Sequence, residues 1–172
     1  MERIGFGGGC HWCTEGVFQA IVGVQQVDQG FIRSDAPSDS CAEAVVVHFD
    51  PRAIDLATLL EIHLRTHSAT KTFAPSGKYR CAVYHFDDTQ ETKIRCFLAA
   101  FRASFDKPLS TAALPFREFR HSDARYQNYY ATDPERPFCK RYIDPKLDFI
   151  RKNFGKIARS NRTDSPSTLS KP

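Results

Sequence analysis

The sequence predicts an α/β protein of the α+β type, a two-layer α/β plait in which helices pack on a ferredoxin-like mixed sheet. The first observation is the order of the patterns along the chain, which alternate between strand and helix as β-α-β-β-α-β-α. The second is the 41% share of apolar residues in a chain of 172 residues, which suffices for one hydrophobic core. Neither a repeat nor a boundary interrupts the pattern before Gly155, so we predict one domain over residues 1–154.

Periodicity and turn residues predict the elements of the first half: a strand over 4–6, a glycine turn over 7–9, a helix over 10–22, a strand over 24–32 and a loop over 34–40. Residues 43–49 alternate strictly and form the clearest strand. This alternation places Glu43 on the same face as the apolar Val45, Val47 and Phe49. A carboxyl group is therefore expected at the start of an otherwise apolar strand face.

The second half continues the same patterns. They predict a helix capped by Asp55, a loop over 68–78 and a strand over 79–86. A capping box over 88–91 opens the next helix, which has Phe105 on its apolar face. A short strand near 117–120 follows, and then a last helix that is capped by Asp144 and stopped by Gly155. His63 and His67 lie on the apolar stripe of the Asp55 helix. Because no third ligand is evident, we interpret them as packed histidines rather than as a metal site.

Charge and cysteine content exclude several classes of protein. The net charge is +4, and residues 155–172 hold four basic residues against one acid, so we predict a basic, disordered tail there. No aromatic residue accompanies those charges, which argues against nucleic-acid binding. No segment is long and apolar enough for a membrane span and no signal segment is evident, so we expect a cytoplasmic monomer with no membrane partner.

Cys10 and Cys13 are the leading candidates for chemistry. Cys10 is expected at the start of a helix, where unpaired N–H groups and the helix dipole favour the thiolate. Three residues later Cys13 shares its face, so the two sulfurs can meet and form a redox pair. The alternatives are two structural thiols or half of a zinc site, which would need a second pair of ligands.

Glu43, Tyr79 and Cys139 are further candidates. Burial beside apolar residues disfavours the charged form of Glu43, so this carboxyl group can hold a proton near pH 7 and donate it; the alternative is an exposed glutamate at a strand edge. Tyr79, at the expected start of a strand, can donate a hydrogen bond into a pocket or merely pack. Cys139 precedes the last helix in a loop from which a thiol can reach a site.

Several motifs together resemble one family. Residues 9–15 (Gly-Cys-His-Trp-Cys-Thr-Glu) are similar to the Gly-Cys-Phe-Trp signature of peptide methionine sulfoxide reductase A. Further similarities to that family lie in the Cys-Ala-Glu-Ala-Val strand at 41–45, its Asp-Pro end at 50–51, the Lys-Tyr-Arg-Cys-Ala-Val-Tyr segment at 78–84, the Tyr-Gln-Asn-Tyr stretch at 126–129 and the C-terminal segment at 139–154. Their order and spacing hold over roughly residues 4–154.

The resemblance implies an enzyme that reduces methionine S-sulfoxide, free or in proteins, and needs no metal or organic cofactor. Cys10 would attack the sulfoxide sulfur, Glu43 would supply a proton, and Tyr79 would donate a hydrogen bond. Trp12 would form the floor of a pocket for the substrate methyl group. A second thiol would condense with the sulfenic acid on Cys10, and thioredoxin or another dithiol would reduce the disulfide.

This sequence departs from the family pattern at four positions. His11 stands where Phe is usual and Phe31 where a second pocket tyrosine is usual, so both belong to the expected substrate site. Ala74 replaces an Asp, and Cys41 replaces a His two residues before Glu43. These changes leave the nucleophile and the acid in place.

The resolving thiol and the activity class both have alternatives. Cys13 is near Cys10 in sequence, and Cys139 matches the usual C-terminal resolving position; we favour Cys13. A general thiol-disulfide oxidoreductase built on Cys10 and Cys13 would fit the same spacing. A non-catalytic module that binds oxidised methionine is the third hypothesis, motivated by Phe31 and Ala74.

Overall fold

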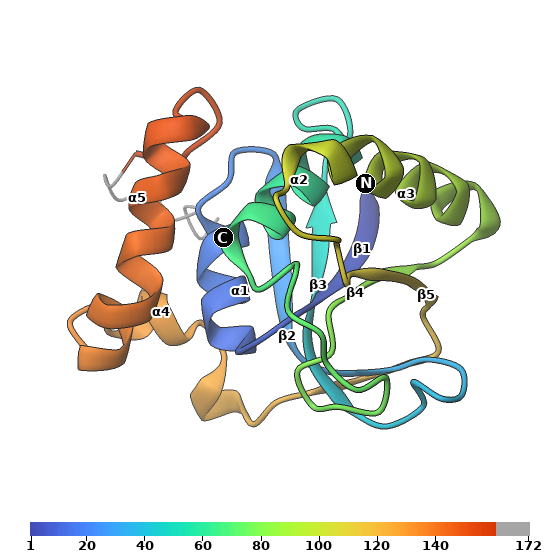
Figure 1. The fold of residues 1–172 in the computed structure, drawn as a ribbon. Helices are drawn as coiled ribbons and strands as arrows, with labels where there is room; N and C mark the ends of the chain where they lie inside the picture. Colours follow the sequence, from blue (N-terminus) through green and yellow to red (C-terminus); the bar gives the residue numbers. More distant parts are fainter. Residues whose placement is uncertain (161–172) are drawn as a thin grey trace, which may run out of the picture.

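The structure of the protein is a computed structural model that describes residues 1–160. A six-stranded sheet runs through it in the order β5-β4-β1-β3-β2-β6 (Figure 1). The strands are β1 (Glu2–Gly7), β2 (Val24–Arg33), β3 (Ala42–Phe49), β4 (Ala82–His85), β5 (Ala112–Pro115) and β6 (Glu118–His121). Only β4 and β5 pair in parallel, so the sheet is mixed.

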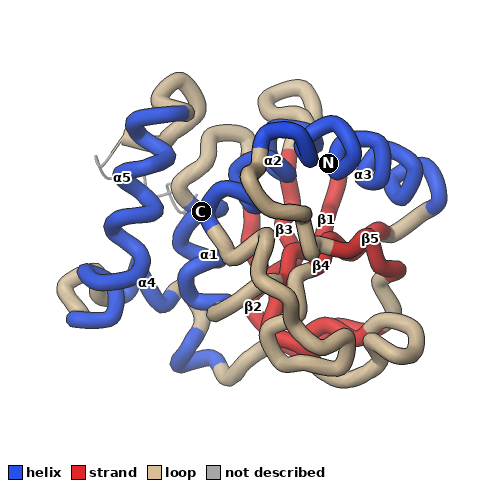
Figure 2. The backbone as a smooth tube through the Cα atoms, in the orientation of Figure 1, coloured by secondary structure: helices blue, strands red, loops and turns tan. Residues whose placement is uncertain are grey.

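The helices lie mainly on one side of the sheet (Figure 2). They are α1 (His11–Gln19), α2 (Leu56–Thr66), α3 (Asp88–Phe101), α4 (Tyr129–Thr132) and α5 (Asp144–Asn153), with a π-helical turn, Cys139–Ile143, directly before α5. Helices α4 and α5 flank α1 on its side away from the sheet. No helix within residues 1–160 is long and apolar enough to cross a lipid bilayer.

The predicted fold class is confirmed by the strand order. Strands β4, β1, β3 and β2 are neighbours in that order and all pair antiparallel, which with α1 and α2 gives the ferredoxin-like β-α-β-β-α-β plait. Strand β5 extends this unit at the β4 edge, and β6 extends it at the β2 edge.

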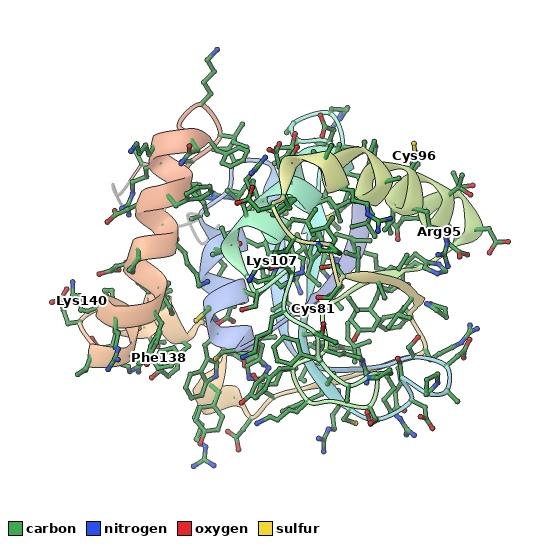
Figure 3. All side chains as sticks on the ribbon, in the orientation of Figure 1. Cys81, Arg95, Cys96, Lys107, Phe138 and Lys140 are labelled. Atoms are coloured by element: carbon green, nitrogen blue, oxygen red, sulfur yellow. The ribbon has the colours of Figure 1, made fainter. Side chains whose placement is uncertain are left out.

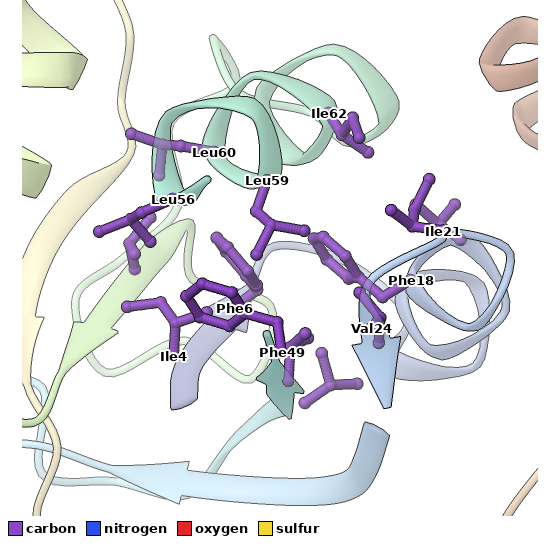
Figure 4. Close-up of a cluster of buried hydrophobic side chains, with 14 of the residues drawn as sticks. Ile4, Phe6, Phe18, Ile21, Val24, Phe49, Leu56, Leu59, Leu60 and Ile62 are labelled. Carbon is purple, nitrogen blue, oxygen red and sulfur yellow. The ribbon is translucent and has the colours of Figure 1, made fainter. Parts of the chain in front are cut away.

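The main core lies between the sheet and its helices. Phe6, Phe18 and Phe49 are fully buried there, together with Leu59 and Leu60 of α2 (Figure 4). Val45 and Val47 belong to this cluster, whereas Ala44 and Val46 belong to a smaller cluster on the other face. The alternation of β3 therefore points Glu43 toward the helices, as predicted from sequence.

Several predicted boundaries are wrong. Helix α1 ends at Gln19 rather than residue 22, and β4 begins only at Ala82, so Tyr79 lies in a turn instead of a strand. The side chain of Asp87, not Asp88, caps α3 by accepting the N–H of Gln90. Helix α3 ends before Phe105, because a 3₁₀ turn replaces its last residues.

The C-terminal part differs most from the prediction. The π-helical turn carries the chain into α5 without a break, so Asp144 lies inside the helix and accepts a hydrogen bond from the Tyr130 hydroxyl instead of capping it. Strand β5 was not predicted.

The predicted boundary at residue 154 is also too early. Ile157 O accepts the N–H of Val22 at 2.7 Å, and the N–H of Arg159 donates to Ala20 O at 2.7 Å. Residues 155–160 are therefore part of the folded body. The remainder of the predicted tail, 161–172, lies outside the described residues.

Candidate active site

Cys10 stands immediately before α1, at the end of the glycine turn. Gly8 and Gly9 have φ angles of 146° and 101°, which glycine adopts without strain, and Cys10 returns to an extended conformation as the N-cap. The Cys13 thiol hydrogen-bonds to Cys10 and, with the backbone N–H groups of Trp12 and Cys13, lowers the pKa of Cys10 below its usual value. Burial and the charge of Glu43 act in the opposite direction. A half-buried thiolate at a helix start is a nucleophile.

Cys13 has the opposite electrostatic character. It is buried, and both its hydrogen bond to Cys10 and its burial raise its pKa. Cys13 therefore stays protonated, and its S–H donates a hydrogen bond to Cys10. The pair is asymmetric, because the same hydrogen bond lowers the pKa of Cys10 and raises the pKa of Cys13.

Cys139 lies in the same region as this pair. It packs in one buried cluster with Cys13, Ile143 and Leu147, and Cys10 lies at the border of that cluster. Its sulfur is 3.6 Å from Asp133 O. The fold thus gathers three thiols from two distant segments, as the alternative assignments of the resolving cysteine require.

The other three cysteines lie elsewhere. Cys41 is exposed, and Cys81 is buried with its sulfur 3.3 Å from Ser68 O. Cys96 is exposed on α3, on the opposite side of the view from Phe138, which borders the thiol cluster (Figure 3).

Glu43 is buried beside the start of α1. Only 6% of the residue is exposed, and its Oε2 accepts the backbone N–H of His11 at 3.1 Å. The predicted alternative, an exposed strand-edge glutamate, is therefore excluded. Its Oε1 lies 2.8 Å from the Lys78 ammonium.

His11 and Phe31 form a wall next to this carboxyl group. His11 Nδ1 is 2.8 Å from Gly30 O, so Nδ1 carries the proton and Nε2 faces Glu43 Oε2 at 3.9 Å. Burial lowers the pKa of His11, which keeps the ring neutral near pH 7. Phe31 pairs with Glu43 across the strands, and its ring meets the His11 ring edge-on at 5.3 Å.

Trp12 lies in a cluster of aromatic rings rather than against open space. Its indole stacks on Tyr129 with 4.1 Å between centroids, and Phe138 meets it edge-on at 5.4 Å. The indole Nε1 is buried and has no hydrogen-bond partner among residues 1–160. The donor is therefore left unsatisfied inside the ring cluster.

Tyr79 occupies the exposed edge of the site. The preceding carbonyl, Lys78 O, accepts the N–H of Glu43 at 2.8 Å, which ties this turn to β3. Tyr79 is 40% exposed, and the Lys78 ammonium lies 5.2 Å from the centre of its ring.

A cavity of about 190 Å³ lies beside the thiols, lined by residues that include Cys10, Cys13, His67 and Lys146. Lys146 donates to Thr66 O, and its positive charge acts to lower the pKa of Cys13. His63 and His67 stack at 3.8 Å and hydrogen-bond to Gly7 O and His63 O, consistent with the packed arrangement expected from their stripe.

Sequence reasoning missed Lys78, Arg120 and Lys146. The Arg120 guanidinium lies 5.1 Å from the centre of the Phe31 ring, on the neighbouring strand β6. Lys78 precedes Tyr79, and its position next to that candidate was the one signal that pointed to it. The other two reach the site only through long-range packing.

The matching family model for this chain describes peptide methionine sulfoxide reductase and covers residues 2–158. The chain belongs to the peptide methionine sulfoxide reductase family. Membership makes the protein an enzyme that reduces methionine sulfoxide, as the motifs indicated.

Relatives of the same family are similar over nearly the whole chain. MsrA of Chromobacterium violaceum is 32% identical, over 93% of this chain and 100% of that protein. MsrA of Deinococcus radiodurans is 34% identical, over 90% of this chain and 83% of that protein.

Solved structures share the fold. The reductase A of Corynebacterium diphtheriae superposes with a TM-score of 0.66, over 77% of this chain and 75% of that chain. Reduced Mxr1 of Saccharomyces cerevisiae superposes with a TM-score of 0.67, over 78% and 86%. Each is 20% identical to this member of the family, so the likeness speaks for the fold alone.

Proposed function

We propose that Cys10 is the nucleophile of this methionine sulfoxide reductase and that Glu43 transfers a proton to the sulfoxide oxygen. The observation that carries the proposal is the position of Cys10, whose pKa the Cys13 thiol lowers, directly before His11, whose N–H donates to the buried Glu43 carboxyl group. The thiolate attacks the sulfoxide sulfur, and the oxygen passes to Cys10. The products are methionine and a sulfenic acid on Cys10, with one proton consumed.

The surrounding side chains would select the substrate. His11 and Phe31 form one wall, Trp12 contributes the accessible part of its apolar ring, and Tyr79 supplies a hydroxyl at the exposed edge. We assign the S epimer, free or in proteins, on the resemblance of the motifs. No metal or organic cofactor enters the reaction.

We propose Cys13 as the thiol that resolves the sulfenic acid. Cys13 donates its backbone N–H to Cys10 O at 3.2 Å and its thiol lowers the pKa of Cys10, whereas Cys139 packs against Cys13 in the cluster behind it. Because Cys10 is the N-cap and lies outside the helix, it can turn toward Cys13 without unwinding α1. Condensation of Cys13–SH with Cys10–SOH releases water and forms the disulfide.

We further propose that thioredoxin or another dithiol reduces this disulfide in a reducing compartment, the cytoplasm. Yeast Mxr1, which shares the fold with a TM-score of 0.59, has been crystallised in complex with Trx2. Each catalytic cycle must begin with reduced thiols, and a reducing compartment such as the cytoplasm keeps them in that state.

The test uses one equivalent of methionine sulfoxide and fully reduced protein. We expect one equivalent of methionine and a Cys10–Cys13 disulfide on mass-spectrometric mapping. A Cys10–Cys139 disulfide would reassign the resolving thiol, and turnover by Cys10→Ser would refute the nucleophile. Reduction of insulin without sulfoxide turnover would favour the general oxidoreductase, and binding without turnover the non-catalytic module.

A further inference from the structure

The buried carboxyl group of the site has a cationic partner at the surface. Lys78 Nζ lies 2.8 Å from Glu43 Oε1, and the side chains are 58% and 8% exposed, respectively. Backbone pairing fixes the two residues together, because the N–H of Glu43 donates to Lys78 O at 2.8 Å. The ammonium is therefore within hydrogen-bond distance of the carboxyl oxygen to which it can pass a proton.

The other groups that face Glu43 offer no equivalent proton. His11 Nδ1 is occupied by Gly30 O, so Nε2 of the neutral ring is a bare acceptor. Cys10 carries negative charge in its reactive form. Tyr79 lies beside Lys78, whose ammonium is 5.2 Å from the ring centre and donates a hydrogen bond to the Tyr79 hydroxyl oxygen. Arg120, over Phe31, holds a guanidinium that does not release protons in proteins.

We propose that Lys78 is the proton source of the reduction and acts through Glu43. The ammonium gives its proton to the carboxylate, which passes it to the sulfoxide oxygen as the Cys10 thiolate attacks. This inference rests on the proposed role of Glu43 as the group that touches the oxygen.

The step balances without a further reactant. The sulfur–oxygen bond of the substrate breaks and one forms on Cys10, so the methionine sulfur is reduced by two electrons and the Cys10 sulfur is oxidised by two. The proton from Lys78 ends on the sulfenic acid. Glu43 is ionised before and after, and the neutral Lys78 amine regains a proton from water.

The chemistry of the pair predicts a distinctive pH dependence. The Glu43 carboxylate raises the pKa of Lys78, so the proton remains available at neutral and alkaline pH. A solitary carboxylic acid would lose its proton in the acidic range instead. The pH above which the reductive step slows therefore distinguishes proton transfer from Lys78 through Glu43 from proton transfer by Glu43 alone.

The experiment measures methionine formation in a single turnover of reduced enzyme from pH 5.5 to 9.5. Lys78→Gln should be slower than wild type by on the order of tenfold or more at pH 8.5 and should recover toward acidic pH. Lys78→Arg keeps the charge but not a transferable proton, so it should be slow across the range. Lys93→Gln, an exposed lysine on α3, is the matched control and should behave as wild type.

Two outcomes would overturn the inference. Wild-type rates in Lys78→Arg would mean that the charge alone matters, and an unchanged pH profile in Lys78→Gln would mean that Lys78 has no part. If Glu43→Gln is inactive while both Lys78 variants are normal, Glu43 takes its proton from water and the proposed function stands without Lys78. Unchanged thermal unfolding verifies that the variants fold.

Discussion

The two cysteines at the start of α1 differ in pKa because one thiol hydrogen-bonds to the other. Cys13 lies in the helix and donates its S–H, and Cys10 lies before the helix and accepts it. Burial alone would protonate both thiols. The hydrogen bond breaks this symmetry, which supports Cys10 as the proposed nucleophile and Cys13 as the proposed resolving thiol.

Removal of that hydrogen bond should weaken Cys10 as a nucleophile near neutral pH. In Cys13→Ala the pKa of Cys10 should rise, so that a smaller fraction of Cys10 is thiolate at a given pH. The pH dependence of iodoacetamide alkylation at Cys10, followed by peptide mass spectrometry, measures the shift. Cys13→Ser retains a hydroxyl donor and serves as the matched control with a smaller shift. An identical midpoint in wild type and Cys13→Ala would contradict this account.

At the scale of elements, sequence periodicity located the structures that carry the site but not their ends. The alternation of residues 43–49 correctly oriented Glu43, because a strand has only two faces. Strand β5 includes Pro115 and lies at an edge of the sheet, where pairing depends on a distant neighbour rather than on local pattern. The π-helical turn at Cys139–Ile143 likewise removed the cap expected at Asp144.

The glycine turn before α1 provides a matched pair of substitutions. Gly8→Ala and Gly9→Ala both place a side chain at positive φ, but a Cβ at Gly8 would overlap the His67 ring and a Cβ at Gly9 meets nothing within 4 Å. We expect Gly9→Ala to cost about 1–2 kcal/mol of unfolding free energy from backbone strain alone. Gly8→Ala should cost clearly more. Urea denaturation measures both, and equal losses would show that His67 is free to move.

Helix α2 should make the protein sensitive to acid. Burial lowers the pKa of His67 to about 4 and that of His63 well below its usual value. In the unfolded chain both take up protons near pH 6.5, so protonation favours unfolding and stability falls as the pH drops from about 7 toward 4. His67 alone should account for about 2 kcal/mol between pH 7 and pH 5.

Urea unfolding of the reduced protein at these two pH values tests this sensitivity. The difference should shrink in His67→Gln and persist in His121→Gln, which alters an exposed histidine on β6. An undiminished difference in His67→Gln would assign the acid sensitivity to other groups.

For the whole molecule, local pattern predicted the plait but not all the contacts that complete the site. Cys10, Glu43 and Cys139 were each identified from their surroundings in the sequence, and the fold brings their segments to the start of α1. Lys78 was not predicted because its proposed role depends on one flexible side chain that reaches from the surface to Glu43. Residues 155–160 were assigned to a tail because their charge is visible in sequence, whereas their backbone pairing with residues 20–22 is not.

The segment after α5 should therefore stabilise the domain. A chain that ends at residue 154 loses the two backbone hydrogen bonds that Ile157 and Arg159 make with residues 20–22, and the packing of Ile157 on the core. It also loses the hydrogen bonds of the Arg159 guanidinium to Ile21 O and Val24 O. Compared with a chain that ends at residue 160, its free energy of unfolding should be lower by about 2 kcal/mol. Calorimetry of the two chains side by side measures this contribution. Equal melting temperatures would show that residues 155–160 do not stabilise the domain.

Trp12 is the chain's single tryptophan, and it is stacked on Tyr129 next to the reactive thiols. Indole fluorescence from this protein therefore originates entirely at the active site. Attack on the sulfoxide, closure of the disulfide and its reduction all change the surroundings of that one ring. The protein contains its own optical reporter, and its catalytic cycle can be followed in real time without a label.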